Sequence, residues 1–289
     1  MDPLTLYMAD GSLFFVGLAV VGLVDLLLLC LGVRSARTRL LRSSLTIMAL
    51  VGIALVVLSA TPLPWFIYLL WAIPAMGALV LGNMSKPSRR SRYIAGALVV
   101  AATAGVSLAE APYRALPSVA VCPGQPLFVL GDSLSAGMGT GERCWPDVLR
   151  DTTGLPVVNL AEPGATVESA MRQASGIPRP GAVVIIEIGG NDLLGGTSTA
   201  AFEAELDALV QGLRSSHHDI LMFELPLFPF RNGYGMAQRQ VAAKYGVALL
   251  PKRCLTAVLG QDGSTLDGLH FSQEGHNAMA EIVARVLKK

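Results

Sequence analysis

Four apolar segments near the start of the chain constrain its fold more than any other feature of the sequence. They comprise residues 11–33, 43–61, 63–82 and 93–109. Each has about 17–23 residues, the length that an α-helix needs to cross the ~30 Å hydrocarbon core of a bilayer. None carries the polar stripe that marks the surface helix of a soluble protein. We therefore expect residues 1–110 to form an all-α transmembrane domain of four helices.

The charges between these segments predict how the helices are oriented. Residues 34–42 and 86–92 each hold four basic residues, whereas the turn at residues 61–64 holds none and the N-terminal tail is acidic. The positive-inside rule places both basic loops in the cytoplasm. The N-terminus and everything beyond the fourth helix are then expected on the periplasmic or exterior side of a cell (inner) membrane. No positive n-region or cleavage site marks the first helix as a signal peptide, so we expect it to be retained.

Two features inside the predicted helices invite an interpretation. Asp25 lies within the first helix, where an acid is a functional-site hypothesis by default. A polar contact between helices or subunits is the interpretation we favour for it. Ala97, Ala101 and Gly105 form a small-residue face on the fourth helix, which predicts close helix packing and is compatible with an oligomer. Four short helices without internal repeats argue against a transporter.

Composition excludes several other classes of protein. Hydrophobic residues make up 52% of the chain and charged residues 15%, which excludes a disordered or fibrous protein. Residues 1–120 carry nine Lys/Arg and four acids, while residues 121–289 carry 13 basic and 17 acidic residues. The basic residues of the first part lie in short clusters, and the second part has no basic stripe with interleaved aromatics. We therefore expect no nucleic-acid partner.

Residues 126–289 have the pattern of an α/β domain, joined to the helices by a proline-containing linker at residues 111–125. Short apolar runs predict strands at residues 126–130, 157–161, 182–188, 219–225 and 246–250. Amphipathic patterns predict helices at residues 145–152, 166–174, 199–215, 235–244 and 273–287. Nearly all-apolar strands that alternate with helices are typical of a parallel sheet covered on both faces. We expect a three-layer α/β/α sandwich with a five-stranded parallel sheet.

Candidate catalytic residues follow the predicted strands, at the edge where such sheets bind ligands. Ser133 follows the first strand and can supply a nucleophile, provided that a base takes its proton. His270, beyond the fifth strand, is the candidate base. Asp267 lies three residues earlier, close enough in a turn to accept a hydrogen bond from the imidazole. The three side chains predict a Ser-His-Asp triad for acyl transfer.

The negative charge that develops during acyl transfer requires hydrogen-bond donors. The backbone N–H of Ser133 is expected near a helix N-terminus, which suits an oxyanion. The backbone N–H of Gly164 and the side-chain amide of Asn191 follow the second and third predicted strands. Ser133, Gly164 and Asn191 are therefore the expected oxyanion hole.

Four blocks in this order resemble the SGNH (GDSL) hydrolase family. They are Gly131-Asp132-Ser133-Leu134, Gly164, Gly189-Gly190-Asn191-Asp192 and Asp267-Gly268-Leu269-His270. Further similarity to bacterial arylesterase, thioesterase and lysophospholipase members lies in Gly131–Gly137, Trp145-Pro146, Ile188–Asp192 and Leu249-Leu250-Pro251. The resemblance covers roughly residues 126–287 and implies a flavodoxin-like SGNH fold. It also implies the triad and oxyanion roles given above, and it leaves the transmembrane half unexplained.

Other site chemistries fit the sequence less well. The spacing of His270 and His276 matches no usual pair of metal ligands, so we expect no metal and no cofactor. Gly137, Gly139 and Gly141 lack the Lys-Ser/Thr ending of a phosphate-binding loop and are interpreted as a flexible rim. His217-His218 is expected in a solvated turn.

Two further expectations concern the surroundings of the site. Cys144 and Cys254 both follow strand ends on the active-site side, so this pair is the expected disulfide if one forms outside the membrane. The apolar, aromatic segment 225–236 could line an acyl pocket through Phe228, Phe230 and Tyr234. Ordinary core packing plus a turn is the alternative for that segment.

The sequence thus predicts a membrane-anchored serine esterase or lipase-type hydrolase. Its expected partners are the lipid bilayer and an acyl ester or thioester from a lipid, a lysolipid or the cell envelope. An acyltransferase that uses an envelope sugar or lipid as acceptor is the alternative. A non-enzymatic membrane scaffold with a degenerate hydrolase domain is a third hypothesis. Acyl length, head group and oligomeric state are left open.

Overall fold

The computed structural model describes residues 3–31, 36–139, 141–178 and 181–288. The chain divides into two compact units. Gly11–Arg114 form the first, which we call the helical unit. Met1–Asp10 and Ala115–Lys289 together form the second, which we call the α/β unit.

The helical unit contains the four helices that the apolar segments predict. They are α2 (Ser12–Cys30), α3 (Ala36–Leu58), α4 (Trp65–Asn83) and α5 (Arg89–Glu110), and a short 3₁₀ turn at Ala111–Arg114 follows. All four are long and apolar enough to cross a membrane. Helices α3 and α5 begin earlier than predicted, because the basic residues before each apolar run are also helical. The predicted end of the first segment at Val33, and Arg34 after it, lie outside the described residues.

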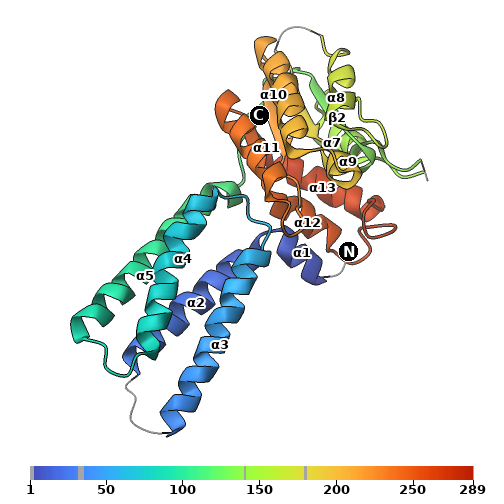
Figure 1. Cartoon of the computed structure of the whole chain (residues 1–289). Coiled ribbons are helices and arrows are strands. Elements are labelled where there is room, and N and C mark those ends of the chain that lie inside the picture. Colours follow the sequence, from blue (N-terminus) through green and yellow to red (C-terminus); the bar gives the residue numbers. More distant parts are fainter. Residues whose placement is uncertain (1–2, 32–35, 140, 179–180, 289) are drawn as a thin grey trace. The chain divides into compact units, whose positions relative to one another are not determined.

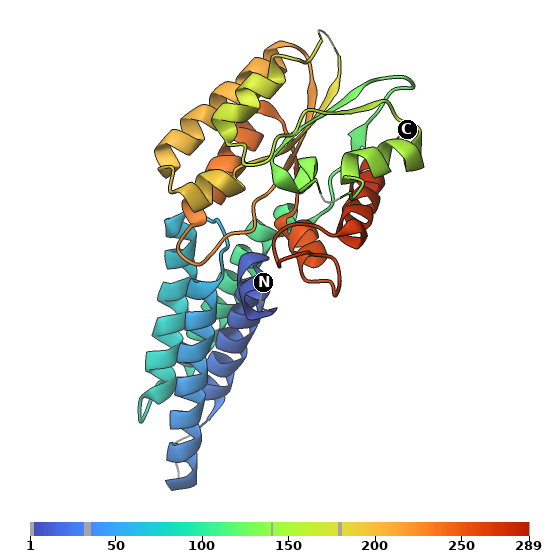
Figure 2. The same ribbon diagram turned by 90° about the vertical axis from the view of Figure 1, so that its right-hand side faces the viewer.

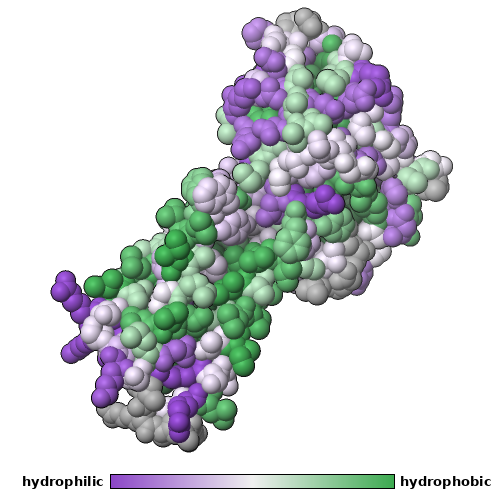
Figure 3. Space-filling view, viewed as in Figure 1, coloured by the Kyte–Doolittle hydropathy of each residue, from purple (hydrophilic) through white to green (hydrophobic). Residues whose placement is uncertain are grey.

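Helix α2 packs against each of the other three helices of this unit. Its contact with α3 is close, since a Cβ added to Gly17 would lie 2.6 Å from the carbonyl oxygen of Gly52. Small residues permit such close approach of two helices in a membrane. Asp25 is fully buried in the unit, and neither of its side-chain oxygens has a hydrogen-bond partner among the residues that the structure describes. Hydrophobic residues cover the outer face of these helices, and hydrophilic residues gather where α4 connects to α5 (Figure 3).

The α/β unit is built on a five-stranded parallel sheet in the order β3-β2-β4-β5-β6. The strands are β2 (Leu127–Gly131), β3 (Val157–Asn159), β4 (Val183–Glu187), β5 (Asp219–Phe223) and β6 (Ala248–Leu250). The five predicted helices are present as α7 (Trp145–Thr153), α8 (Val167–Ala174), α10 (Thr199–Ser215), α11 (Asn232–Tyr245) and α13 (Gln273–Val286). Each of these ten strands and helices begins and ends within three residues of its predicted boundary, and the three-layer fold is confirmed.

Helices cover both faces of the sheet (Figures 1 and 2). Side chains alternate between the faces, so Leu127 and Val129 of β2 lie in one core with α7, α13 and a further helix, α12 (Lys252–Leu259). Helices α8, α10 and α11 pack together on the other face. Full burial of all five residues of β4 explains why this strand is apolar throughout.

Several elements of the α/β unit were not predicted. Helix α1 (Pro3–Ala9) packs against α12, where Leu6 lies over Gly260. Strand β1 (Val119–Ala120) pairs in parallel with β7 (Leu287–Lys288). Residues 115–125, part of the expected linker, therefore belong to the α/β unit. The chain passes from one unit to the other after Asp10 and again after Arg114. These elements are too short to produce a periodic pattern.

The expectation for His217-His218 was wrong at its second residue. His217 is exposed, as expected. His218 is buried, and its Nδ1 accepts a hydrogen bond from the backbone N–H of Ala182 at 3.2 Å. The neutral imidazole thereby satisfies a donor next to β4, which is a packing role.

The expected disulfide between Cys144 and Cys254 is also wrong, because both thiols are free. Cys144 precedes α7, where its Sγ donates to the carbonyl oxygen of Ala136 at 2.9 Å. Cys254 lies in α12 and is buried in the core. Helix α13 packs against both α7 and α12. Following strand ends at the same edge therefore did not bring the two sulfur atoms together.

Candidate active site

Ser133 lies at the point where the strand order reverses, between the carboxyl ends of β2 and β4. Asp132 caps the short helix α6 (Ser133–Ala136), and its Oδ1 accepts from the backbone N–H of Leu134 at 3.0 Å. Ser133 is therefore the first residue of a helix that begins directly after a buried strand. It is half-buried, in a crevice position typical of ligand sites in such sheets.

The last residue of β2, Gly131, packs closely against Ser135 and Glu187. A Cβ at that position would lie 2.8 Å from Ser135 Oγ and 3.0 Å from the carbonyl oxygen of Glu187, so a larger residue does not fit. Gln173 of α8 accepts from the N–H of Gly131 and donates to its carbonyl oxygen, each at 3.0 Å. No sequence motif marks Gln173, whose only signal is an amide on the buried face of an amphipathic helix.

The predicted base and its orienting acid are brought together. His270 Nδ1 lies 2.7 Å from Asp267 Oδ2. Asp267 Oδ1 also accepts from the backbone N–H groups of Leu269 and His270, at 2.9 and 2.8 Å. These hydrogen bonds hold the pKa of Asp267 well below its usual range. The ionised carboxylate favours a proton on Nδ1, which leaves Nε2 of His270 as the basic nitrogen.

Ser133 and His270 do not form a hydrogen bond to each other in the described part of the chain. Their neighbours in sequence nevertheless line one cavity, which Asp132 and Leu134 share with Asp267 and Leu269. Burial raises the pKa of Asp132, and the charge of His270 opposes that rise. The structure thus places the serine block and the histidine block around the same cavity.

The expected oxyanion donors lie beside this serine block. Asn191 is in α9 (Gly190–Gly195), which follows β4 directly. Its Nδ2 donates to Asp132 Oδ2 at 3.1 Å and to the carbonyl oxygen of Ala165 at 3.0 Å. Gly164 is exposed and has a φ of 77°, a conformation that favours glycine. Both N–H groups of Asn191 already donate hydrogen bonds. To bind an oxyanion, Asn191 must either share one N–H between two acceptors or release one of these two bonds.

Asp132, which accepts a hydrogen bond from Asn191, belongs to a buried pair of acids. The carboxyl groups of Asp132 and Glu187 are hydrogen-bonded to each other, and the two residues are only 4% and 3% exposed. Burial raises the pKa of both, and the charge of Asp132 raises that of Glu187 further. Two carboxylates cannot bond without a proton between them. The raised pKa values therefore favour a proton held between the two carboxyl groups.

The acid pair continues into a fully bonded polar network. Ser135 Oγ donates to Glu187 Oε2 at 2.8 Å and accepts from Trp145 Nε1 at 3.1 Å. The backbone N–H of Trp145 donates to Nδ1 of His276 at 3.1 Å, so that nitrogen is occupied. In the described residues, no group of three or more His, Cys, Asp or Glu side chains is arranged to hold a metal.

Asp192, beside the expected oxyanion donor, has a packing role. It is buried, and its Oδ2 accepts from the backbone N–H of Val167 at 3.1 Å. That bond fixes the start of α8 to α9. Burial raises the pKa of Asp192, and the hydrogen bond from Val167 opposes this shift.

The cavity beside Ser133 has a volume of about 300 Å³ and a mainly apolar lining. Phe228 contributes to that lining, as expected. Phe230 and Tyr234 do not. Phe230 is 75% exposed, while Tyr234 is buried against Phe202 and its hydroxyl donates to the carbonyl oxygen of Thr197. For Tyr234 the alternative of core packing describes the structure.

The five-stranded parallel sheet, its switch-point crevice and a cavity lined by Asp132, Leu134 and Asp267 are features of a hydrolase class. Residues 129–278 match the model of the GDSL-like Lipase/Acylhydrolase family, and the chain belongs to this family. Membership confirms the resemblance seen in the four sequence blocks. It makes the α/β unit an SGNH-type carboxylic ester hydrolase domain.

Individual relatives match a little more than half of the chain. Thioesterase 1/protease 1/lysophospholipase L1 of Escherichia coli (strain K12) is 26% identical over 175 residues, which is 56% of this chain and 83% of that protein. Esterase TesA of Pseudomonas aeruginosa (strain PAO1) is 28% identical over 179 residues, 57% of this chain and 88% of that protein. A crystal structure of TesA is similar with a TM-score of 0.50 and 28% identity, over 56% of this chain and 97% of that one.

Proposed function

We propose that this protein is a membrane-anchored serine esterase that cleaves acyl esters or thioesters. The observation that carries the proposal is the 2.7 Å contact between Asp267 and His270 Nδ1, at the cavity that the serine block also lines. A histidine held in this tautomer can act as a general base towards a hydroxyl group. Ser133, the first residue of α6, is the proposed source of that hydroxyl.

In the proposed reaction, Nε2 of His270 takes the proton of Ser133 as its Oγ attacks the acyl carbonyl. The bond from carbonyl carbon to the leaving oxygen or sulfur then breaks, and the imidazolium returns the proton to the leaving group. Water, activated by the same imidazole, cleaves the acyl-enzyme and regenerates Ser133. Asp267 remains ionised throughout and stabilises the imidazolium.

The backbone N–H groups of Ser133 and Gly164 and the amide of Asn191 are proposed to bind the oxyanion. The Asp132–Glu187 pair supports this role, because Asp132 Oδ2 holds the amide of Asn191 at the crevice. Fixed donors of this type typically contribute about 3 kcal/mol each to lowering the barrier.

The apolar cavity indicates where the acyl group binds. Leu193, Leu225 and Phe228 line it, together with Leu255 and Leu259. Its volume of about 300 Å³ is at the lower end of the range of ligand pockets, so short or medium acyl chains are the proposed substrates. The names of the relatives, which include thioesterase, esterase and lysophospholipase, support an acyl substrate.

For the membrane topology, we propose four spans with the N-terminus and the α/β unit both outside the cytoplasm. Helix α1 belongs to the α/β unit, so the two ends of the helical unit must emerge on one side. Four crossings, an even number, satisfy this requirement. The basic residues of segments 34–42 and 86–92 then face the cytoplasm.

A fluorophosphonate probe tests the nucleophile in the full-length protein. The probe reacts with an activated serine, so we expect labelling of the wild type and none of Ser133→Ala. Ser175→Ala removes an exposed hydroxyl from the end of α8 and should label like the wild type. Labelling that survives Ser133→Ala would identify a different nucleophile.

Product analysis with a panel of esters distinguishes hydrolysis from acyl transfer. A hydrolase yields free acid at the same rate with or without candidate sugar or lipid acceptors. Acylated acceptor as the main product would instead support the acyltransferase alternative.

A further inference from the structure

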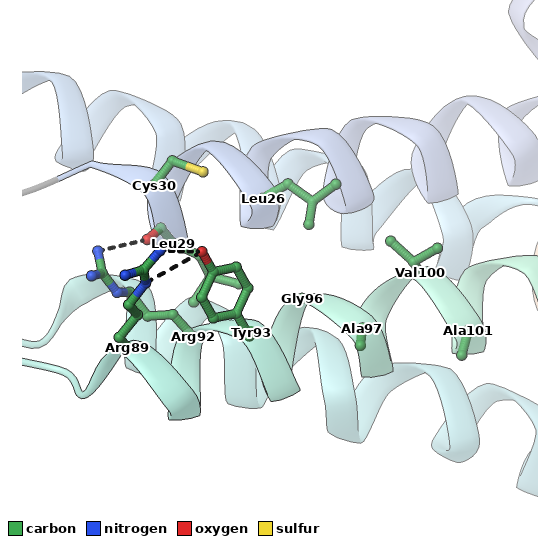
Figure 4. Close-up of a pocket in the computed structure, with 10 residues that line it drawn as sticks. All are labelled: Leu26, Leu29, Cys30, Arg89, Arg92, Tyr93, Gly96, Ala97, Val100 and Ala101. Atoms are coloured by element: carbon green, nitrogen blue, oxygen red, sulfur yellow. Dashed lines mark hydrogen bonds between the residues drawn. The ribbon is translucent and has the colours of Figure 1, made fainter.

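The helical unit contains a groove between α2 and α5 that no other helix of the unit fills. Leu26 and Leu29 of α2 and Gly96, Ala97 and Val100 of α5 line it, and its volume is about 680 Å³. We call this the α2–α5 groove. Figure 4 shows these apolar side chains along its length and Arg89, Arg92 and Tyr93 together at one end.

The small-residue face of α5 thus differs from its sequence interpretation. Ala97 and Ala101 line the open groove rather than a tight helix–helix contact. At Gly105, an added Cβ would meet no atom within 4 Å. At Gly96, by contrast, an added Cβ would lie 3.4 Å from Leu26 Cδ2, so the two helices do touch at the closed side of the groove. The small side chains on this face of α5 leave an open groove instead of allowing the helices to pack closely.

The charged end of the groove lacks an acid from this chain. Arg89 donates from Nε and Nη2 to the hydroxyl of Tyr93, at 3.4 and 3.2 Å. Arg92 donates from Nη1 to the carbonyl oxygen of Leu29 at 3.3 Å. In residues 3–31 and 36–139, neither guanidinium forms an ion pair. The sequence from residue 26 to residue 109 contains no Asp or Glu at all.

The geometry points to an anionic phospholipid of the bilayer as the occupant of the α2–α5 groove. Its phosphate would lie at Arg89 and Arg92, beside the N-terminus of α5, whose helix dipole also favours negative charge. An acyl chain would lie along the apolar length of the groove past Gly96, Ala97 and Val100. Basic pockets between transmembrane helices are a recurring way to bind anionic head groups. This site lies wholly within the helical unit and does not depend on the proposed esterase activity.

The test compares two lipids that share their acyl chains and differ in charge. Dioleoyl phosphatidylglycerol and dioleoyl phosphatidylcholine are titrated into the full-length protein in detergent, and bound lipid is counted by native mass spectrometry. Each arginine near an anionic head group contributes about a fivefold gain in affinity, so we expect about a 25-fold preference for phosphatidylglycerol.

Charge variants locate the preference at the groove. Arg89→Gln with Arg92→Gln should abolish it, and Arg89→Gln alone should reduce it about fivefold. The single variant preserves the bond from Arg92 to Leu29, so it stays informative if the double variant fails to fold. Arg90→Gln removes an exposed charge from the same turn and should change nothing. No preference in the wild type, or an equal loss with Arg90→Gln, would overturn the proposal.

A size variant tests the acyl part of the site. Ala97→Leu fills the groove and should weaken binding of both lipids, whereas Gly77→Leu places a leucine side chain at an exposed position of α4 and should not. Equal binding by Ala97→Leu would show that no chain enters the groove. A wild-type dimer that binds no lipid and becomes monomeric with Ala97→Leu would show that a second copy occupies it.

Discussion

The two units of this chain differ in how completely their buried polar atoms are paired. In the α/β unit, Gln173, Glu187 and Asp192 are buried and each forms hydrogen bonds. In the helical unit, Asp25, Trp71 and Thr103 have buried side-chain oxygen or nitrogen atoms without a partner in the described residues. Asn232 is the one such residue in the described part of the α/β unit. In the described residues, buried polar atoms without a partner are therefore more frequent in the bundle of helices than in the α/β unit.

The difference follows from how each unit satisfies its backbone. A helix in a bilayer makes all of its hydrogen bonds internally, so apolar length alone is enough to form it. Its side chains need not match a particular neighbour, and polar atoms and grooves can remain for lipids or other molecules. A parallel sheet collects the ends of separate strands at one edge, where a site works only if side chains from several segments fit one another.

The largest expected effect tests the pair that carries the catalytic proposal. Asp267→Asn should lower kcat about 10⁴-fold, because the amide favours the wrong tautomer of His270. The low pKa of Asp267 means that the wild-type carboxylate is ionised across the whole assay range, so this loss should persist at every pH. Glu274→Gln, an exposed acid in the first turn of α13, is the control. A loss of less than about tenfold would remove Asp267 from the mechanism.

A smaller effect is expected at the oxyanion donor. Asn191→Ala should lower kcat about 10²–10³-fold with little change in KM, since the donor acts mainly in the transition state. Asn277→Ala, on an exposed turn of α13, should have no effect. If KM rose instead and kcat held, Asn191 would be a binding or structural residue.

The shared proton of the acid pair predicts a dependence of stability on pH. Burial raises the pKa of Glu187 in the folded protein above its value of about 4.3 in the unfolded chain. The contribution of the protonated side chain to the free energy of unfolding is therefore complete below about pH 4.3, and it is lost as pH rises through the pKa of the folded protein. Glu187→Gln keeps the bonding pattern without a titrating proton. The wild type should therefore lose stability relative to the variant as pH rises, by about 1.4 kcal/mol per unit of raised pKa.

Thermal unfolding of the detergent-solubilised chain, followed from pH 5 to 9, measures this effect. Glu203→Gln replaces an exposed acid of α10 and should run parallel to the wild type. Parallel curves for Glu187→Gln as well would mean that the buried pair does not hold its extra proton.

The smallest effect on activity is expected in the helical unit. Asp25→Leu removes a buried acid without a partner, so it should stabilise the helices by about 1–3 kcal/mol and change kcat/KM by less than about twofold. Limited proteolysis in detergent measures the stability of the helices, and an ester assay in membranes measures kcat/KM. Loss of assembly or activity would favour the other interpretation of Asp25, a functional acid within the membrane.

Sequence reasoning succeeded where local patterns decide the structure. Apolar length predicted α2 to α5, and alternation of short apolar runs with amphipathic ones predicted the five strands and their covering helices. It failed where the outcome depends on which elements become neighbours. Cys144 and Cys254 follow strands at one edge but do not bond, and the ring of Tyr234 packs on Phe202 instead of lining the cavity. Segments 3–9 and 119–120 are too short to signal that they join the α/β unit.

The sequence by itself determined four membrane-length helices, a parallel α/β sheet and the residues whose chemistry marks an acyl hydrolase. Hydrophobic periodicity and residue type are properties of short stretches of chain, and these features depend on nothing more. Only the tertiary structure decided that Asp132 and Glu187 form a buried acid pair, that Gln173 holds the end of β2 and that small residues of α5 line an open groove. These are contacts between segments tens of residues apart, and packing of the whole chain selects them.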